Sequence, residues 1–332
     1  MRSQLKRREF ITLLGGAAAL PLAARAQPSG KVVRIGFLSS ASATGAGYQN
    51  RIAGLRSGLR DLGYVEGANV IIEYRWAEEN YAQLPELAAD LVRSNVDVIV
   101  THGTPPTLAA KRATATVPIV MAIIGDPVAS GVVTNVARPG GNLTGSSFFG
   151  PELGAKRIEL LKETLPQLTR VAVLLNPDNP VQMSAELQAM QTVAQSLKLQ
   201  LKPFPVRASN EFERTFENMQ REHIEAVALG EDPIFIDNLS GIAMLASKRR
   251  LLSIGSKEFA PAGGLIGYGI DFPAAFRRAA MFIDKILKGT KPGDIPIEQA
   301  TKFEFVLNLK TARALGFEVP TPILLRADEV IE

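Results

Sequence analysis

Residues 96–128 constrain the fold most, because they predict a strand, a helix and a second strand in close succession. Residues 97–100 form an apolar, β-branched run, which is typical of strands buried on both faces of a parallel sheet. An Ala-rich segment follows Pro105 and Pro106, and a second apolar run covers residues 119–124. Such a unit predicts a parallel sheet with a binding site at the carboxyl ends of its strands.

Strand-like and helix-like segments alternate along most of the remaining chain. Further strand patterns lie at residues 32–38, 70–74, 143–147, 170–175, 200–206, 226–229, 251–254, 265–268 and 303–307. Strands that alternate with helices predict an α/β fold with mostly parallel sheets. Roughly eleven strands are too many for one comfortable sheet, so we expect two doubly wound lobes, with the first boundary near residues 148–151.

The first 26 residues have the features of an export signal. A basic stretch at residues 6–8 is followed by an apolar run at residues 11–22 and by a small-residue site that ends at Ala26. Because the apolar run is too short to span a bilayer, we expect a secretory signal that is cleaved after this site. The pair Arg7 and Arg8 resembles the twin-arginine type, with the general secretory route as the alternative.

Removing this segment leaves a chain without net charge. The full sequence has 37 Lys and Arg and 33 Asp and Glu residues, and residues 1–26 hold five of the basic and one of the acidic side chains. The mature chain therefore has 32 residues of each sign. The basic character of the full chain comes from the signal, so it is no evidence for nucleic-acid binding.

The sequence contains no cysteine. This excludes disulfides, thiolate catalysis and cysteine-based metal sites. It also excludes the lipid-modified cysteine that anchors many exported proteins. We therefore expect a protein without a membrane anchor that is retained in the periplasm.

Sequence signatures of enzymes are missing. No G-x-G-x-x-G follows the first strand, and no phosphate-binding loop or G-x-S-x-G elbow is present. His102 and His223 are the only histidines and fall in different expected lobes, so we expect neither a metal site nor a cofactor. A hydrolase that uses His102 with Ser39 or Ser40 is the enzyme alternative.

Six residues at the predicted ends of strands are candidates for ligand binding: Ser39, Ser40, Thr104, Asp126, Asp232 and Asp271. A proline follows Thr104, so its hydroxyl and the N-terminus of the next helix could hold a carboxylate; a simple helix cap is the alternative. Each aspartate could bind an ammonium group or serve only as a turn or cap residue. Residues 125–127 and 230–233 have similar sequences, so we expect Asp126 and Asp232 to face each other across a cleft.

Six segments, spread over nearly the whole mature chain, resemble one known family. They read IGFL at residues 35–38, TVPIV at 116–120, GDPV at 125–128, RPGGNLTG at 138–145, GYGID at 267–271 and LGFEVP at 315–320. Together they are similar to the substrate-binding proteins of ABC importers, in particular the relatives of tryptophan- and phenylalanine-binding components. The loop at residues 40–49 departs from this family by lacking an acidic residue, which leaves the ligand open.

The resemblance implies a type I periplasmic-binding-protein fold, in which two lobes joined by a hinge close over a ligand. We expect residues 31–147 with about 270–300 in lobe 1, and residues 148–269 in lobe 2. Residues 301–332 are expected to return across the hinge as a C-terminal segment. The resemblance also implies an ABC permease in the inner membrane and an ATPase as partners.

The expected function is capture of a small polar solute and its delivery to the permease, without chemical change. An amino acid, in particular an aromatic one, is the leading candidate for this ligand. A ligand-binding component of a sensor system is the alternative. We expect Asp232→Ala to weaken ligand binding at least about tenfold while the melting temperature without ligand stays near that of the wild type.

Overall fold

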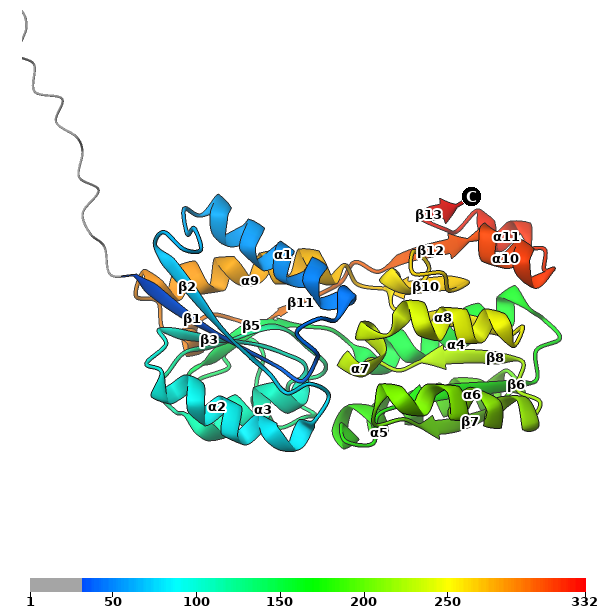
Figure 1. Ribbon diagram of the computed structural model, residues 1–332, viewed down its shortest axis with the longest axis horizontal. Coiled ribbons are helices and arrows are strands. Elements are labelled where there is room, and N and C mark those ends of the chain that lie inside the picture. Colours follow the sequence, from blue (N-terminus) through cyan, green and yellow to red (C-terminus); the bar gives the residue numbers. More distant parts are fainter. Residues whose placement is uncertain (1–31) are drawn as a thin grey trace, which may run out of the picture. The chain divides into compact units, whose positions relative to one another are not determined.

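The computed structural model describes residues 32–332, so the predicted signal at residues 1–26 lies outside the described residues. Residues 33–332 form one compact unit with two β-sheets, each covered by helices on both faces (Figure 1). The strand orders are β11-β5-β4-β3-β1-β2 in the first sheet and β13-β12-β10-β9-β8-β6-β7 in the second. Among the described helices, none is long and apolar enough to cross a membrane.

The first sheet is parallel throughout its described pairings. Its strands are β1 (Val33–Ser39), β2 (Val70–Trp76), β3 (Val98–His102), β4 (Ile119–Ile124), β5 (Leu143–Ser147) and β11 (Glu298–Gln299). Helices α1 (Ala46–Asp61) and α9 (Phe272–Leu287) cover one face, and α2 (Leu84–Arg93) and α3 (Thr104–Ala113) cover the other (Figure 1). The central strands β3 and β4 are buried along their whole length, as their apolar sequences predict.

The second sheet is parallel except for the pair formed by β10 and β12. Its strands are β6 (Arg170–Leu175), β7 (Gln200–Pro205), β8 (Ala226–Leu229), β9 (Leu252–Gly255), β10 (Ile266–Gly269), β12 (Glu304–Asn308) and β13 (Glu329–Ile331). Its helices are α4 (Gly150–Thr164), α5 (Pro180–Ser196), α6 (Phe212–Arg221), α7 (Pro233–Asp237), α8 (Leu239–Lys248), α10 (Leu309–Leu315) and α11 (Thr321–Leu324). The predicted α/β class with two doubly wound sheets is confirmed.

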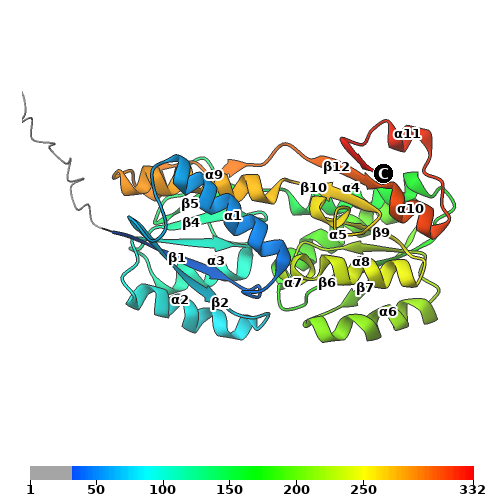
Figure 2. The same ribbon diagram turned by 45° about the horizontal axis from the view of Figure 1, so that its top comes forward.

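The chain passes between the two sheets at three places. These are residues 148–149 between β5 and α4, residues 270–271 between β10 and α9, and residues 300–303 between β11 and β12, the last of which leads to the orange strand in Figure 2. We call the first sheet with its helices lobe 1 and the second sheet with its helices lobe 2. We propose that these two lobes have the residue boundaries expected from the sequence.

Helices α1 and α9 lie side by side in Figures 1 and 2 because two glycines of α1 leave room for the backbone of α9. A Cβ atom at Gly54 would lie 2.4 Å from the carbonyl oxygen of Pro273, and one at Gly58 would lie 2.4 Å from that of Arg277. Both distances are far below van der Waals contact, so any side chain here would force the two helices apart.

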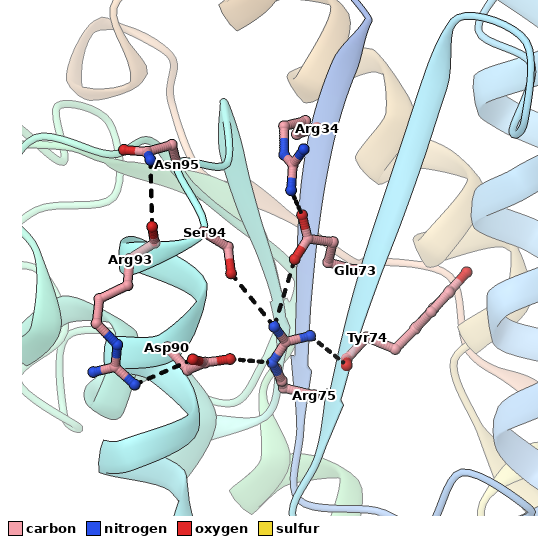
Figure 3. Close-up of polar contacts among 8 residues, drawn as sticks. All are labelled: Arg34, Glu73, Tyr74, Arg75, Asp90, Arg93, Ser94 and Asn95. Atoms are coloured by element: carbon pink, nitrogen blue, oxygen red, sulfur yellow. Dashed lines mark hydrogen bonds and ion pairs between the residues drawn. The ribbon is translucent and has the colours of Figure 1, made fainter.

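Charged side chains of the edge strand β2 pair with residues of β1 and α2 over one face of the first sheet (Figure 3). Arg34 pairs with Glu73, and the Nε atom of Arg75 donates to the Oδ2 atom of Asp90 at 2.6 Å. Asp90 also pairs with Arg93 one turn further along α2. Charges of this kind protect an edge strand from pairing with other chains, and they attach α2 to the edge of the sheet.

Candidate functional site

A cavity lies where the carboxyl ends of strands from both lobes come together. The strand order reverses between β1 and β3 in lobe 1 and between β6 and β8 in lobe 2, and doubly wound sheets bind their ligands at such points. The cavity, which we call the central cavity, has about 330 Å³ of space that no atom occupies, part of it open to solvent. Its lining comprises His102, Gly103, Thr104, Ile123, Gly125, Phe148, Asn179, Glu231, Asp232, Pro233, Ile236 and Phe272.

Thr104 lies in the wall of the central cavity, and it does not cap α3, which was the alternative role for this residue. The cap is Gly103, whose φ of 80° suits glycine, and Thr104 is the first helical residue. No side chain forms a cap hydrogen bond at this end. Because Pro105 and Pro106 have no N–H, the helix offers a ligand anion the amide and hydroxyl of Thr104 rather than the usual cluster of amides.

Asp232 is the aspartate of the cavity wall in lobe 2. It is 3% exposed and caps α7, where its Oδ1 atom accepts a hydrogen bond from the N–H of Ile234. Oδ1 also accepts hydrogen bonds from Asn176 at 3.0 Å and from the Tyr81 hydroxyl at 2.7 Å, and Oδ2 accepts one from Asn179 at 3.1 Å. Burial raises the pKa of Asp232, against the opposing effect of these hydrogen bonds. Oδ2, with a single protein donor, keeps acceptor capacity for a ligand.

Asp126 lines a different hollow, which is bordered by Phe149 and Gln299. Its carboxylate accepts hydrogen bonds from the N–H groups of Val128 at 2.8 Å and Ala129 at 3.0 Å. It therefore has the turn role that was the alternative for this residue. Gly125, not Asp126, lines the central cavity with Asp232, so the expected pairing of the two aspartates across the cleft is wrong for this structure.

Asp271 also lies outside the central cavity, although its neighbour Phe272 lines it. Its carboxylate caps α9 by accepting the N–H of Ala274 at 2.8 Å, and it pairs with Lys257 at 3.0 Å. Burial acts to raise the pKa of Asp271, but the hydrogen bond and the lysine outweigh it and lower that pKa. Asp271 therefore has the cap role that was the alternative for this residue.

Ser39 and Ser40 are fully buried at the end of β1, behind the wall of the cavity. The Oγ atom of Ser39 accepts a hydrogen bond from the N–H of Ala41 at 3.1 Å. The hydroxyl of Ser40 lies beside that of Tyr81. Both serines thus support residues of the site, and contact with a ligand stays a proposal for each.

A buried group formed by Tyr48, Arg51 and His102 lies on the lobe 1 side of the cavity and was not predicted. The Arg51 guanidinium lies 3.8 Å from the ring centroid of Phe272, and its Nη1 atom donates to the Nε2 atom of His102 at 3.2 Å. Because arginine can only donate, the ring proton of His102 is on Nδ1, which bonds to the Tyr48 hydroxyl. Burial, and then the charge of Arg51, lower the pKa of His102 well below its ordinary value.

This arrangement bears directly on the hydrolase alternative. Both ring nitrogens of His102 are engaged by Tyr48 and Arg51, which leaves neither to activate Ser39 or Ser40. In this structure His102 connects Tyr48 to Arg51 in the lobe 1 wall of the cavity. Within the described residues, no group of three or more His, Cys, Asp or Glu side chains is placed to hold a metal ion.

A second hollow of about 170 Å³ continues behind Asp232 in lobe 2. Glu186, which is 1% exposed, lines it and accepts a hydrogen bond from the N–H of Glu231 at 3.2 Å. Burial, and then the charge of Glu231, raise the pKa of Glu186 to about 8. Arg157 forms a buried ion pair with Glu231 and donates to the carbonyl oxygen of Tyr268. The two buried glutamates, Glu186 and Glu231, therefore have one compensating cation beside them.

This chain is similar to known substrate-binding proteins. A family model described as ABC transporter substrate binding protein matches residues 41–331. A tyrosine-binding protein from Clostridioides difficile (strain R20291) is 25% identical over 267 residues, which cover 80% of this chain and 76% of that protein.

Two solved structures are similar over 90% of this chain, each with 25% sequence identity. One is a conserved domain protein from Vibrio cholerae O1 biovar El Tor, with a TM-score of 0.83 and 100% of its chain covered. The other is an ABC domain from Streptococcus pneumonia in complex with L-Trp, with a TM-score of 0.80 and 99% of its chain covered.

Proposed function

The chain belongs to the family of ABC transporter substrate binding proteins, and from this premise we propose that it captures an amino acid in the central cavity and delivers it to a membrane permease. Its fold is that of the type I periplasmic binding proteins, and its family and neighbours bind solutes rather than transform them. A relative that binds tyrosine and a neighbour that holds L-Trp support an aromatic amino acid as the ligand.

One observation carries this proposal: the two walls of the central cavity offer groups of opposite polarity. The amide and hydroxyl of Thr104 suit a carboxylate, and the Oδ2 atom of Asp232 suits an ammonium group. Between them, the rings of Phe148 and Phe272, with centroids 6.2 Å apart, border apolar space for a side chain. Charge-assisted hydrogen bonds contribute about 1.5–3 kcal/mol each, so two or three with some apolar burial support about micromolar binding.

Binding in this scheme needs movement of the lobes but no chemistry. The three crossings at residues 148–149, 270–271 and 300–303 are short and serve as the hinge. A ligand that touches both Thr104 and Asp232 favours the closed arrangement, because only that arrangement provides both contacts.

The proposal includes a place in the cell. We propose that residues 1–26 direct export to the periplasm, where the protein meets a permease in the inner membrane. A sensor receptor in place of the permease is the alternative. Genes for a permease and an ATPase beside the coding gene favour import, whereas a gene for a receptor kinase favours the sensor.

The test of the binding site is Asp232→Asn, measured by calorimetric titration of the mature chain with L-Trp and L-Tyr. With its amide oxygen in the place of Oδ1, asparagine keeps the acceptor for the buried donors Tyr81 and Asn176. It removes the charge and puts an NH2 group where Oδ2 accepts from Asn179, so we expect affinity to fall at least about tenfold. Alanine would also leave those donors unpaired and lower the melting temperature without ligand, which revises the expectation from the sequence.

The matched control is Asp126→Asn, because Asp126 is an aspartate at the end of a strand that lies outside the central cavity. Its affinity is expected to equal that of the wild type. Equal loss in both variants, or no loss in either, would remove Asp232 from the site.

A further inference from the structure

Residues 78–81 follow β2 and reach from lobe 1 to lobe 2. The Oε1 atom of Glu79 accepts a hydrogen bond from the Nδ2 atom of Asn238 at 3.2 Å, and Oε2 accepts one from the N–H of Ser209 at 3.2 Å. Asn238 follows α7 and Ser209 precedes α6, so one glutamate connects two elements of the opposite lobe.

The same segment reaches the candidate ligand residue through Tyr81. Its hydroxyl donates to the Oδ1 atom of Asp232 at 2.7 Å. Burial, and then the charge of Asp232, raise the pKa of Tyr81 well above its ordinary value. The hydroxyl therefore keeps its proton and remains a donor, which orients the Asp232 carboxylate and leaves Oδ2 toward the cavity.

The backbone of this segment is held in a strained conformation. Glu78 and Glu79 have φ angles of 47° and 64°, in the left-handed region that residues with a side chain rarely adopt. Their N–H groups donate to the carbonyl oxygens of Ala41 at 3.2 Å and Ser40 at 2.9 Å. The loop after β1 thus fixes the turn that directs Glu79 and Tyr81 at lobe 2.

We propose that Glu79 and Tyr81 act as a clasp that stabilises closure of the lobes, with Tyr81 as the positioning residue for Asp232. This inference rests on the hinge closure of the proposed function. Opening of the lobes would break the bonds of Glu79 to Asn238 and Ser209 and the bond of Tyr81 to Asp232 together. Tyr81 therefore orients the Asp232 carboxylate for a ligand only when the lobes are closed.

The test measures the distance between the lobes without any ligand. Because the chain has no cysteine, Glu86→Cys in α2 and Met244→Cys in α8, both exposed, can carry one spin label each. We expect the double variant Glu79→Ala with Tyr81→Phe to reduce the population with the short interlobe distance at least about threefold relative to the wild type.

Glu78→Ala is the matched control, since the Glu78 carboxylate bonds only to the N–H of Ala43 within lobe 1 among the described contacts. It should leave the distance distribution unchanged. The clasp is overturned if all three proteins give the same distribution, or if the wild type shows only the long distance. The spin labels measure the interlobe distance without ligand, so this experiment tests the clasp independently of binding. Failure of every amino acid to bind would contradict the proposed function alone.

Tyr81→Phe alone tests the positioning role. It removes one hydroxyl while the ring and the bonds of Glu79 remain, so we expect at least about tenfold weaker binding of L-Trp with little change in the melting temperature. Unchanged affinity of this variant for L-Trp would overturn the role of Tyr81 as a positioning residue.

Discussion

Glu186 is a buried residue whose protonation depends strongly on folding. It is buried in lobe 2 beside Glu231, and burial raises its pKa to about 8 from an ordinary value of 4.5. The folded chain therefore binds a proton that the unfolded chain releases at lower pH. A carboxyl group with a raised pKa makes the folded state lose stability as the pH rises between those two values.

The predicted result is a fall in the unfolding free energy of the wild type between about pH 5 and pH 8, at most about 1.4 kcal/mol per pH unit from this group. Glu186→Gln should make that fall smaller, because a neutral amide binds no proton, while Asp237, whose pKa is raised by burial to about 7, keeps its own contribution of the same sign. Urea unfolding at several pH values measures both. Glu217→Gln, at an exposed position of α6, is the control and should keep the slope; an unchanged slope in Glu186→Gln would contradict the assignment.

The sequence predicted which residues lie at the ends of strands, but not what their side chains contact. Thr104 and Asp232 do line the central cavity, as the strand–loop patterns indicated. Asp126 and Asp271 occupy similar positions, but their carboxylates turn to nearby backbone N–H groups. Local sequence cannot distinguish these outcomes, because both satisfy the same strand-end pattern.

The residues that the sequence did not predict act over long distances in the chain. Arg51 reaches His102, and Tyr81 reaches Asp232 in the other lobe. No spacing rule connects such positions. A weak signal existed for Arg51, which lies next to Ile52 and one turn before Leu55 on the buried face of α1.

At the scale of elements, the contact between α1 and α9 depends on glycine at two positions one turn apart. Gly54 and Gly58 let the backbones approach so closely that a methyl group has no space. The sequence predicted both helices, but not that these glycines serve close packing, since glycine in a helix also occurs without such a role.

We predict that Gly58→Ala lowers the unfolding free energy by about 1–3 kcal/mol through this overpacking. Gly241→Ala in α8 is the matched control, because a Cβ atom there has nothing within 4 Å, and alanine should stabilise its helix by about 0.5–1 kcal/mol. Thermal unfolding of both variants measures the two effects. Stabilisation in both would contradict the close approach of α1 and α9.

The elements that the sequence missed are short. β11 has two residues, β13 has three and α11 has four, too few for a hydrophobic period to appear. β13 is held by pairing with β12 and β11 by pairing with β5. Their formation depends on neighbours distant in sequence, whereas the long buried strands β3 and β4 carry their own signal.

At the scale of the whole molecule, the two sheets follow from the alternation of strands and helices. The same alternation does not predict that the chain passes back and forth between the sheets. Pairing of β11 with β5 joins residues about 150 positions apart and leaves no local signature. The resemblance to a family supplied the expectation of two lobes joined by a hinge, and the strand orders of the two sheets agree with it.

The most direct test of reversible capture is equilibrium binding of the twenty common amino acids to the mature wild-type chain, with the bound solute recovered and weighed by mass spectrometry. We predict one saturable site, occupied best by an aromatic amino acid with a Kd of about 1 μM, and a recovered solute of unaltered mass. Absence of binding by every amino acid, or a recovered solute of altered mass, would contradict the account.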